Sequence, residues 1–272
     1  MTTLTAIAHA PAETTPAPLA GMHNIFRKEV QEWFRTRRFL ATAILTSLLT
    51  GAAPVIMFLY NSGLQHGRLA LSPSTYNDMM DAWVGISVTL GALLLVALTM
   101  GILIKEEESG TAQWVFTKPV SRLGYGLAKW GANSLVAIVG AVLIPATVSL
   151  GLTEAVTSTG IRSWAGIFGA IGLMAFYMTI GIALIMALSS IFRSQAPVAG
   201  LAIVMIYLPI FFEGITAARI WSRLFPVMIG QIASSVAQGR DVVSWESLVS
   251  SIVLLPLCLA FSCYRLSRKQ LQ

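Results

Sequence analysis

Six long apolar runs dominate the chain, and each is close to the length that a helix needs to cross a bilayer. They lie at residues 39–60, 82–104, 131–152, 165–188, 197–212 and 248–264, and the last two are the shortest. A hydrocarbon core about 30 Å thick needs roughly 17–25 residues of helix. No Lys, Arg, His, Asp or Glu stands inside any of the runs. The pattern therefore predicts an all-α, polytopic membrane protein with six transmembrane helices.

The segment before the first run, residues 22–38, is amphipathic. On a helical wheel its apolar side chains fall within about half the circumference, and they include Phe26, Trp33 and Phe34. The other half carries most of the charged side chains, although Glu29 and Arg37 intrude on the apolar half. This pattern favours a helix that lies in the membrane interface, with its apolar face toward the lipids and its basic face toward anionic headgroups. The alternative is a helical extension of the first span.

The same patterning sets the expected domain boundaries. Residues 1–21 are rich in Ala, Thr and Pro and are expected to form a disordered cytoplasmic tail; residues 22–38 form the interfacial connecting helix, and residues 39–272 the six-helix transmembrane domain. Between the last two spans, residues 224–237 form an apolar run that Pro226 interrupts. This run is too short to cross a bilayer, so it predicts a re-entrant or interfacial hairpin on the outer side.

Composition and charge support this class and give an orientation. Hydrophobic residues make up 56% of the 272 residues and charged ones only 11%, whereas soluble domains carry about 25% charged residues. Placing the N-terminus in the cytoplasm puts thirteen of the 18 Lys and Arg residues on the cytoplasmic side. Basic residues favour that side, so both termini are expected inside. The net charge of +6 thus reports topology, and no nucleic-acid partner is expected.

The residues offer little catalytic chemistry. The chain has no G-x-x-x-x-G-K-[ST] phosphate loop and no H-E-x-x-H metal motif, and its three histidines lie outside the apolar runs. A proton relay normally needs ionisable side chains within the bilayer, which the runs lack. No catalytic, cofactor or metal residue is therefore expected. The chain is not predicted to be an enzyme, and any energy for transport has to come from another subunit.

The segment at residues 105–129, between the second and third runs, is the most informative part of the chain. Gly110 permits a sharp turn, and Thr111 can cap a short helix over residues 112–117. Pro119 would end that helix, and Ser121 can cap the helix that leads into the next span. This spacing predicts a short surface helix, although an ordinary loop against the headgroups is the alternative.

This segment resembles the signature loop of the permeases of type-2 ATP-binding-cassette (ABC) transporters. That loop reads E-x-E-x-G-T, then an apolar segment, P-V-S-R and G-K. The matching positions are Glu106, Glu108, Gly110, Thr111, Pro119, Val120, Ser121, Arg122 and Lys129. The chain departs from the family at Ala128, where Gly is usual, and at Trp114, where Leu is usual. Residues 28–37 also resemble the family's N-terminal connecting helix, so the similarity covers nearly the whole chain from residue 22.

The resemblance implies a permease subunit of a bacterial ABC transporter in the cytoplasmic (inner) membrane. Such a subunit pairs with a second permease copy or homologue and binds two cytoplasmic ABC ATPase subunits, which hold the ATP and Mg²⁺. The short helix would be the coupling helix, with Trp114 and Phe116 filling a groove on the ATPase. Arg122 would either pair with the carboxylates of Glu106–Glu108 or contact the ATPase.

The cargo is predicted from the polarity of the spans. Their polar groups are hydroxyls and amides, such as those of Thr46, Asn133 and Tyr177, which suit an amphiphilic lipid, drug or peptide. Small residues, including Gly85, Gly91, Gly166 and Ala170, would allow close helix packing. We therefore expect an exporter whose cargo path follows the permease dimer interface. Members of the family that this chain resembles carry cargo as different as sodium ions, polysaccharides and sulfur species. The alternative function is that of a six-span protein that is not a transporter, such as a channel or an assembly factor.

Overall fold

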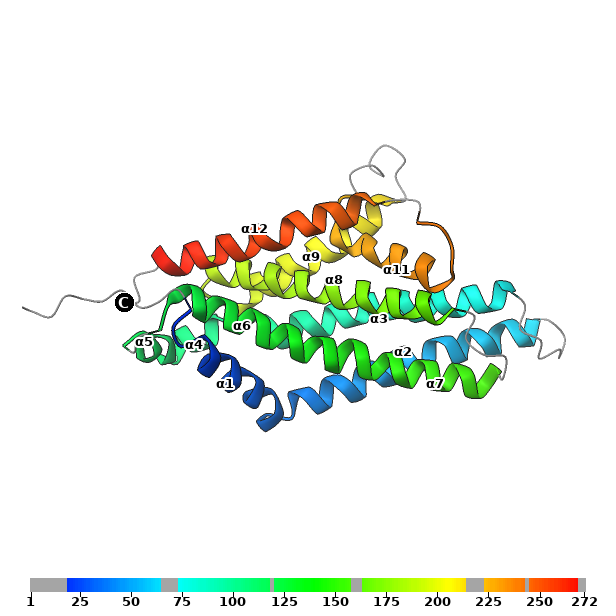
Figure 1. Cartoon of the computed structure of the whole chain (residues 1–272), viewed down its shortest axis with the longest axis horizontal. Helices are drawn as coiled ribbons and strands as arrows, with labels where there is room; N and C mark the ends of the chain where they lie inside the picture. The colour runs from blue at the N-terminus through cyan, green and yellow to red at the C-terminus, as the bar shows by residue number, and fades with distance from the viewer. Residues whose placement is uncertain are drawn as a thin grey trace, which may run out of the picture.

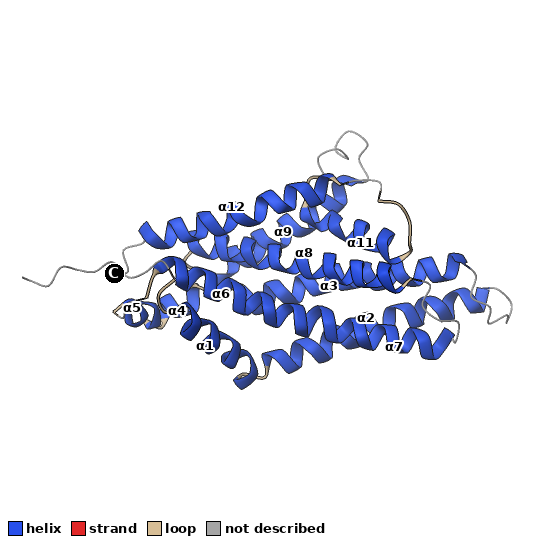
Figure 2. Cartoon of the chain, viewed as in Figure 1, coloured by secondary structure: helices blue, strands red, loops and turns tan. Residues whose placement is uncertain are grey.

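Long helices lie side by side along the longest axis of the molecule (Figure 1). The computed structural model describes residues 19–64, 73–117, 120–157, 163–213, 223–242 and 245–268. Every regular element among these residues is helical (Figure 2), which confirms the all-α prediction for this part of the chain. Residues 1–18 of the expected tail lie outside the described residues.

The helices fall into two groups by length. The long ones are α2 (Arg38–Leu64), α3 (Pro73–Thr99), α6 (Arg122–Ala137) with its continuations η1 (Ile138–Leu143) and α7 (Ile144–Thr157), α8 (Trp164–Ile191), α9 (Gln195–Glu213) and α12 (Glu246–Arg268). The short ones are α1 (Met22–Arg35), α4 (Ile104–Glu108), α5 (Thr111–Phe116), η2 (Pro226–Met228) and α11 (Ile229–Ala237). We call the end of the bundle that carries α4 and α5 the α5 end, and the end that carries α11 the α11 end (Figure 1).

Five helical segments among the described residues are long and apolar enough to cross a membrane. They are Arg38–Tyr60, Thr75–Glu108, Arg122–Ala155, Trp164–Ile191 and Glu246–Arg268. The remaining expected run, residues 197–212, lies in α9, whose apolar part Gln195–Ile210 is shorter. The third span also begins earlier than expected, at Arg122 instead of residue 131. The five segments establish a polytopic membrane protein, and the sixth crossing is taken up below as a proposal.

The third span contains a π-helical turn, η1, between α6 and α7. Pro145 follows this turn closely, and its ring removes one backbone donor and clashes with the preceding turn of an α-helix. A π turn is a common way to absorb such a disturbance. The hydroxyl of Thr46 on α2 bonds to Thr42 of its own helix at 2.6 Å and also lies 3.2 Å from the carbonyl oxygen of Gly140, so a neighbouring helix contacts the local irregularity.

The segment predicted as an outer hairpin is described from residue 223. It forms the 3-10 turn η2 and then α11, which packs against α3 and α8 at the α11 end (Figure 1). Ile229 and Ala233 are fully buried. A Cβ at Gly166 of α8 would lie 2.3 Å from the carbonyl oxygen of Val236, so the close contact expected at Gly166 exists, whereas a Cβ at Gly85 would meet nothing within 4 Å.

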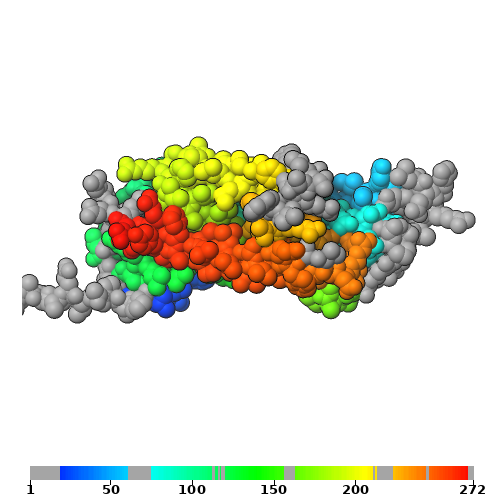
Figure 3. Space-filling view, turned by 90° about the horizontal axis from the view of Figure 1, so that it is seen from above, coloured from blue at the N-terminus to red at the C-terminus, as the bar shows by residue number. Residues whose placement is uncertain are grey.

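Apolar side chains cover much of the outer surface. On α12, which crosses the face shown in Figure 3, Val249, Ile252 and Leu257 are more than half exposed. On α2, Ile44 and Leu48 are each 67% exposed. A monomeric soluble protein rarely exposes such continuous apolar surface, so this surface fits helices that face lipid or other transmembrane helices.

Candidate functional site

The short helices α4 and α5 lie at the α5 end, after the chain leaves α3 (Figure 1). Gly110 separates them with φ +69°, a left-handed conformation that glycine adopts without a Cβ penalty. Gly110 is also the N-cap residue of α5, and Thr111 is the first helical residue, with its hydroxyl 2.8 Å from that of Ser109. The short helix is therefore confirmed, whereas the predicted capping by Thr111 is wrong.

The two faces of α5 have different surroundings. Val115 packs against a buried apolar cluster that includes Ile25 of α1, Leu103 and Tyr125. Trp114, one residue earlier, is 62% exposed. Pro119 and the side chain of Phe116 lie outside the described residues. One face of α5 thus packs on the protein, while most of the Trp114 side chain is exposed.

The start of α6 ties this end of the bundle to two other segments. The Ser121 hydroxyl accepts a hydrogen bond of 2.9 Å from the backbone N–H of Gly124, which confirms the predicted cap. The guanidinium of Arg122 donates to the carbonyls of Leu266 at 2.9 Å and Ser267 at 2.6 Å. A cation is favourable beside the unpaired carbonyls of a helix C-terminus. The structure thus adds α12 to the two partners that the sequence suggested for Arg122.

An ionic cluster, buried at its centre around Lys129, joins α1, α4 and α6. The ammonium of Lys129 lies 2.9 Å from Glu29 Oε1 and 3.1 Å from Glu106 Oε2, and its side chain is only 2% exposed. Glu106 also accepts hydrogen bonds from Lys28 Nζ at 2.6 Å and from the hydroxyl of Tyr125 at 2.5 Å. We call Lys28, Glu29, Glu106, Tyr125 and Lys129 the ionic cluster.

The charges of the ionic cluster balance one another. Burying a charge is costly unless it is paired and hydrogen-bonded, and here two ammonium groups face two carboxylates. Burial alone would lower the pKa of Lys28, but its hydrogen bond to Glu106 and the nearby negative charges of Glu106, Glu29 and Glu32 raise this pKa above its usual 10.5. Lys28 therefore stays charged at neutral pH and completes the pairing.

The connecting helix α1 packs on α6 instead of resting wholly on lipid. Trp33 is 5% exposed, and its indole N–H donates to Asn133 Oδ1 at 2.9 Å. Phe26 lies beside Gly131 and packs against the apolar cluster near Tyr125. Phe34 is 54% exposed. The expectation that Phe26, Trp33 and Phe34 share one lipid-facing surface is therefore corrected, because α6 covers Trp33 and supplies a hydrogen-bond acceptor for its indole.

The ionic cluster was the main feature that sequence reasoning missed. Lys129 was identified only as part of a family motif, and Glu29 only as a charge intruding on the apolar face of a helix. Such an intrusion is itself the signal, because a carboxylate on a buried face needs a cation from elsewhere. Within the described ranges, no group of three or more His, Cys, Asp or Glu side chains could hold a metal ion.

The sequence was compared with models of known protein families, and one match extends over all of the elements described above. A sequence model of the family described as "ABC-2 family transporter protein" matches residues 23–271. The match begins within α1, includes α4, α5 and the whole ionic cluster, and extends past the end of α12. No curated protein matches the chain.

Proposed function

The chain belongs to the ABC-2 family of transporter proteins, and on this premise we propose that it is the permease subunit of a bacterial ABC exporter. It crosses the inner membrane six times, with both termini and the α5 end in the cytoplasm. It acts with a second permease copy or homologue and binds two ABC ATPase subunits. These subunits hold ATP and Mg²⁺ and carry out the hydrolysis, so the chain itself has no catalytic residue.

One observation carries the proposal: α5 projects an exposed aromatic side chain from a rigidly held base. Trp114 is 62% exposed, and aromatic anchors of this kind supply much of the energy of protein interfaces. Val115 fixes the other face of α5 on the bundle. An ATPase bound at Trp114 would therefore act on a helix that packs against the transmembrane domain.

The ionic cluster is the route by which movement of α5 would reach the spans. Glu106, on α4 next to α5, is paired with Lys28 of α1 and Lys129 of α6. A force on α5 would thus displace α1 and α6 together with α4. Because a buried ion pair resists separation, the cluster favours rigid-body movement over local bending.

The sixth crossing and the orientation have separate support. At 1.5 Å per residue, the 19 residues of α9 span about 28 Å, close to the thickness of a hydrocarbon core. The excess of basic residues toward the α5 end favours a cytoplasmic location for that end. With α9 as a span, α12 returns the chain to the cytoplasmic side.

We further propose that the cargo is an amphiphile such as a lipid, a hydrophobic drug or a peptide, moving along the permease dimer interface. Most hydroxyls in the described spans bond within the protein: Thr46 and Thr99, for example, donate to carbonyls of their own helices. The remaining outward surface is mainly apolar. An assembly factor or channel is the alternative function, and neither needs the exposed Trp114 of α5.

Copurification tests the proposal. The chain is coexpressed with candidate ABC ATPases from the same genome, and the amount of ATPase recovered with the purified permease is measured. Trp114→Ala should reduce that recovery at least tenfold, because loss of an anchoring aromatic costs about 2–4 kcal/mol. Trp164→Ala is the matched control, since Trp164 is 56% exposed at the start of α8. Failure of the wild-type chain to bind any ABC ATPase would overturn the proposed function.

A further inference from the structure

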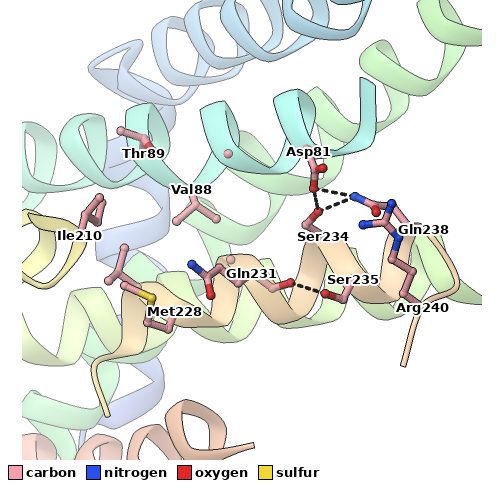
Figure 4. Close-up of a pocket in the computed structure, with 13 residues that line it drawn as sticks. Asp81, Val88, Thr89, Ile210, Met228, Gln231, Ser234, Ser235, Gln238 and Arg240 are labelled. Atoms are coloured by element: carbon pink, nitrogen blue, oxygen red, sulfur yellow. Dashed lines mark hydrogen bonds between the residues drawn. The ribbon is translucent and has the colours of Figure 1, made fainter. Parts of the chain in front are cut away.

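A cavity of about 340 Å³ lies between α3, α9 and α11 near the α11 end. Its volume is within the range of small-molecule sites, roughly 300–1,000 Å³. Figure 4 shows that its wall changes in character along its length: Asp81, Ser234, Gln238 and Arg240 lie toward one end, and Ile210 and Met228 toward the other. The cavity is therefore amphipathic, with a charged end and an apolar end.

The charged end is built around Asp81 of α3. Its Oδ1 accepts hydrogen bonds from the hydroxyl of Ser234 and from Gln238 Nε2, the latter at 2.6 Å. Arg240 lines the same end (Figure 4), and the described part of the chain shows no ion pair between Arg240 and Asp81. A carboxylate and a guanidinium thus share one end of the cavity without neutralising each other directly.

The side-chain oxygen of Gln238, Oε1, accepts no hydrogen bond from the described residues. Its Nε2 also donates to the backbone carbonyl of Asn77 at 3.3 Å, so two acceptors on α3 fix the orientation of the amide. Gln238 Oε1 is buried and has no hydrogen-bond partner among the described residues. A buried acceptor without a donor is unfavourable, but the Gln238 amide is held at the charged end through its N–H groups, which face Asp81 and the Asn77 carbonyl.

The apolar end of the cavity is lined by side chains of α3 and η2 that are themselves buried in the bundle. Val88, Val227 and Met228 line it and are themselves almost fully buried. Gly85 also lines the cavity, and a Cβ there would meet nothing within 4 Å. A hydrocarbon chain could therefore lie beside Gly85 and Val88 while its head stays at the charged end.

We propose that this cavity binds an amphiphile whose head carries both a primary ammonium and an anionic group, as the head of a phosphatidylethanolamine does. The ammonium pairs with Asp81, the anion faces Arg240, and the hydrocarbon chain lies along Val88 and Val227. Because the site is at the end opposite α5, it serves as the release-side cargo site. The assignment as a release-side cargo site rests on the proposed export function, whereas the proposed binding of the amphiphile does not depend on it.

The test uses the full-length chain in nanodiscs with a fluorescent phosphatidylethanolamine as the probe. The comparison probes are the same lipid with its amine acetylated and a phosphatidylglycerol with the same acyl chains. Asp81→Asn should weaken binding of the ethanolamine lipid about tenfold, as expected for loss of a charge-assisted hydrogen bond, and should leave the two comparison probes unchanged. Asp78→Asn is the matched control, one helical turn away on α3 and outside the cavity lining.

A second variant tests occupancy of the apolar end. Gly85→Leu fills open space within the cavity, and should weaken binding of the ethanolamine lipid at least tenfold. Gly172→Leu on α8, where a Cβ likewise meets nothing within 4 Å, should not. Equal binding of all three probes, or unchanged binding by both Asp81→Asn and Gly85→Leu, would overturn the proposal.

The outcome separates this inference from the proposed function. If the chain binds its ATPase and supports ATP-driven export, but the ethanolamine lipid does not bind, the cavity assignment is wrong and the permease function stands. If the lipid binds as described but no ABC ATPase associates with the chain, the cavity is a lipid site and the exporter proposal fails.

Discussion

The ammonium of Lys129 lies 2.9 Å from the carboxylate of Glu29, although the two residues are 100 positions apart in the chain. This contact fixes the connecting helix α1 on the third span at a point where both side chains are buried. Glu106 Oε2 lies 3.1 Å from the same ammonium. The chain thus places α1, α4 and α6 around one cation.

Replacing that cation should destabilise the protein markedly. Lys129→Met leaves Glu29 and Glu106 buried with only Lys28 as a counter-charge, and removing one partner of a buried ion pair costs about 3–5 kcal/mol. The measurement is thermal unfolding of the purified chain in one fixed detergent. Lys105→Met, at an exposed position on α4, is the control and should change the stability by less than about 0.5 kcal/mol.

The same cluster provides an internal rescue. The double variant Glu29→Gln, Lys129→Met leaves Lys28 paired with Glu106, so its charges balance again. It should be more stable than Lys129→Met alone. If the double variant is as unstable as the sum of the two single variants, the ionic cluster is not a charge-balanced unit.

Gly166 provides a separate test of the packing at the α11 end. A Cβ there would lie 2.3 Å from the carbonyl oxygen of Val236, so Gly166→Ala should force α11 away from α8 at a cost of about 1–3 kcal/mol. Gly172→Ala, on the same helix with open space, should be neutral or stabilising by up to about 1 kcal/mol. Equal unfolding temperatures for the two variants would contradict the close packing of α8 and α11.

The orientation predicts where an impermeant reagent can reach. Single cysteines replace Gln65, in the segment between the first two spans, and Gln113 on α5. In intact cells a membrane-impermeant maleimide should label position 65 and leave position 113 unlabelled until the cells are opened. The wild-type chain, with Cys258 buried and Cys263 partly buried, gives the background. The reverse labelling pattern would invert the topology.

The apolar runs were sufficient to predict the helical class and most of the spans, because their length and lack of charge follow from the bilayer alone. The start of the third span was placed too late, at the apolar run from residue 131, whereas the helix begins at Arg122 and includes Lys129. In the structure Glu29 and Glu106 neutralise Lys129, and the carbonyls of α12 receive Arg122. The intrusion of Glu29 indicates that a cation is needed, but partners so distant in sequence cannot be paired from a local pattern.

In the candidate site, the features that depend on neighbouring residues were predicted, whereas the contacts between distant helices were not. The motif around residues 105–129 located α5 and the cap at Ser121, which depend on neighbouring residues. The helical wheel identified the apolar face of α1 but could not distinguish lipid from another helix as its cover. Trp33 therefore looked lipid-facing, whereas Asn133 of α6 accepts its hydrogen bond.

The central claim is that an ABC ATPase docks on α5, and site-specific photo-crosslinking tests it most directly. A benzophenone amino acid is placed at Trp114 or, as a control, at Phe168, which is 65% exposed near the start of α8. The permease is irradiated while coexpressed with its ATPase. We predict a permease–ATPase adduct from position 114 and none from position 168. An adduct only from position 168, or from neither position in a complex that still copurifies, would contradict docking at α5.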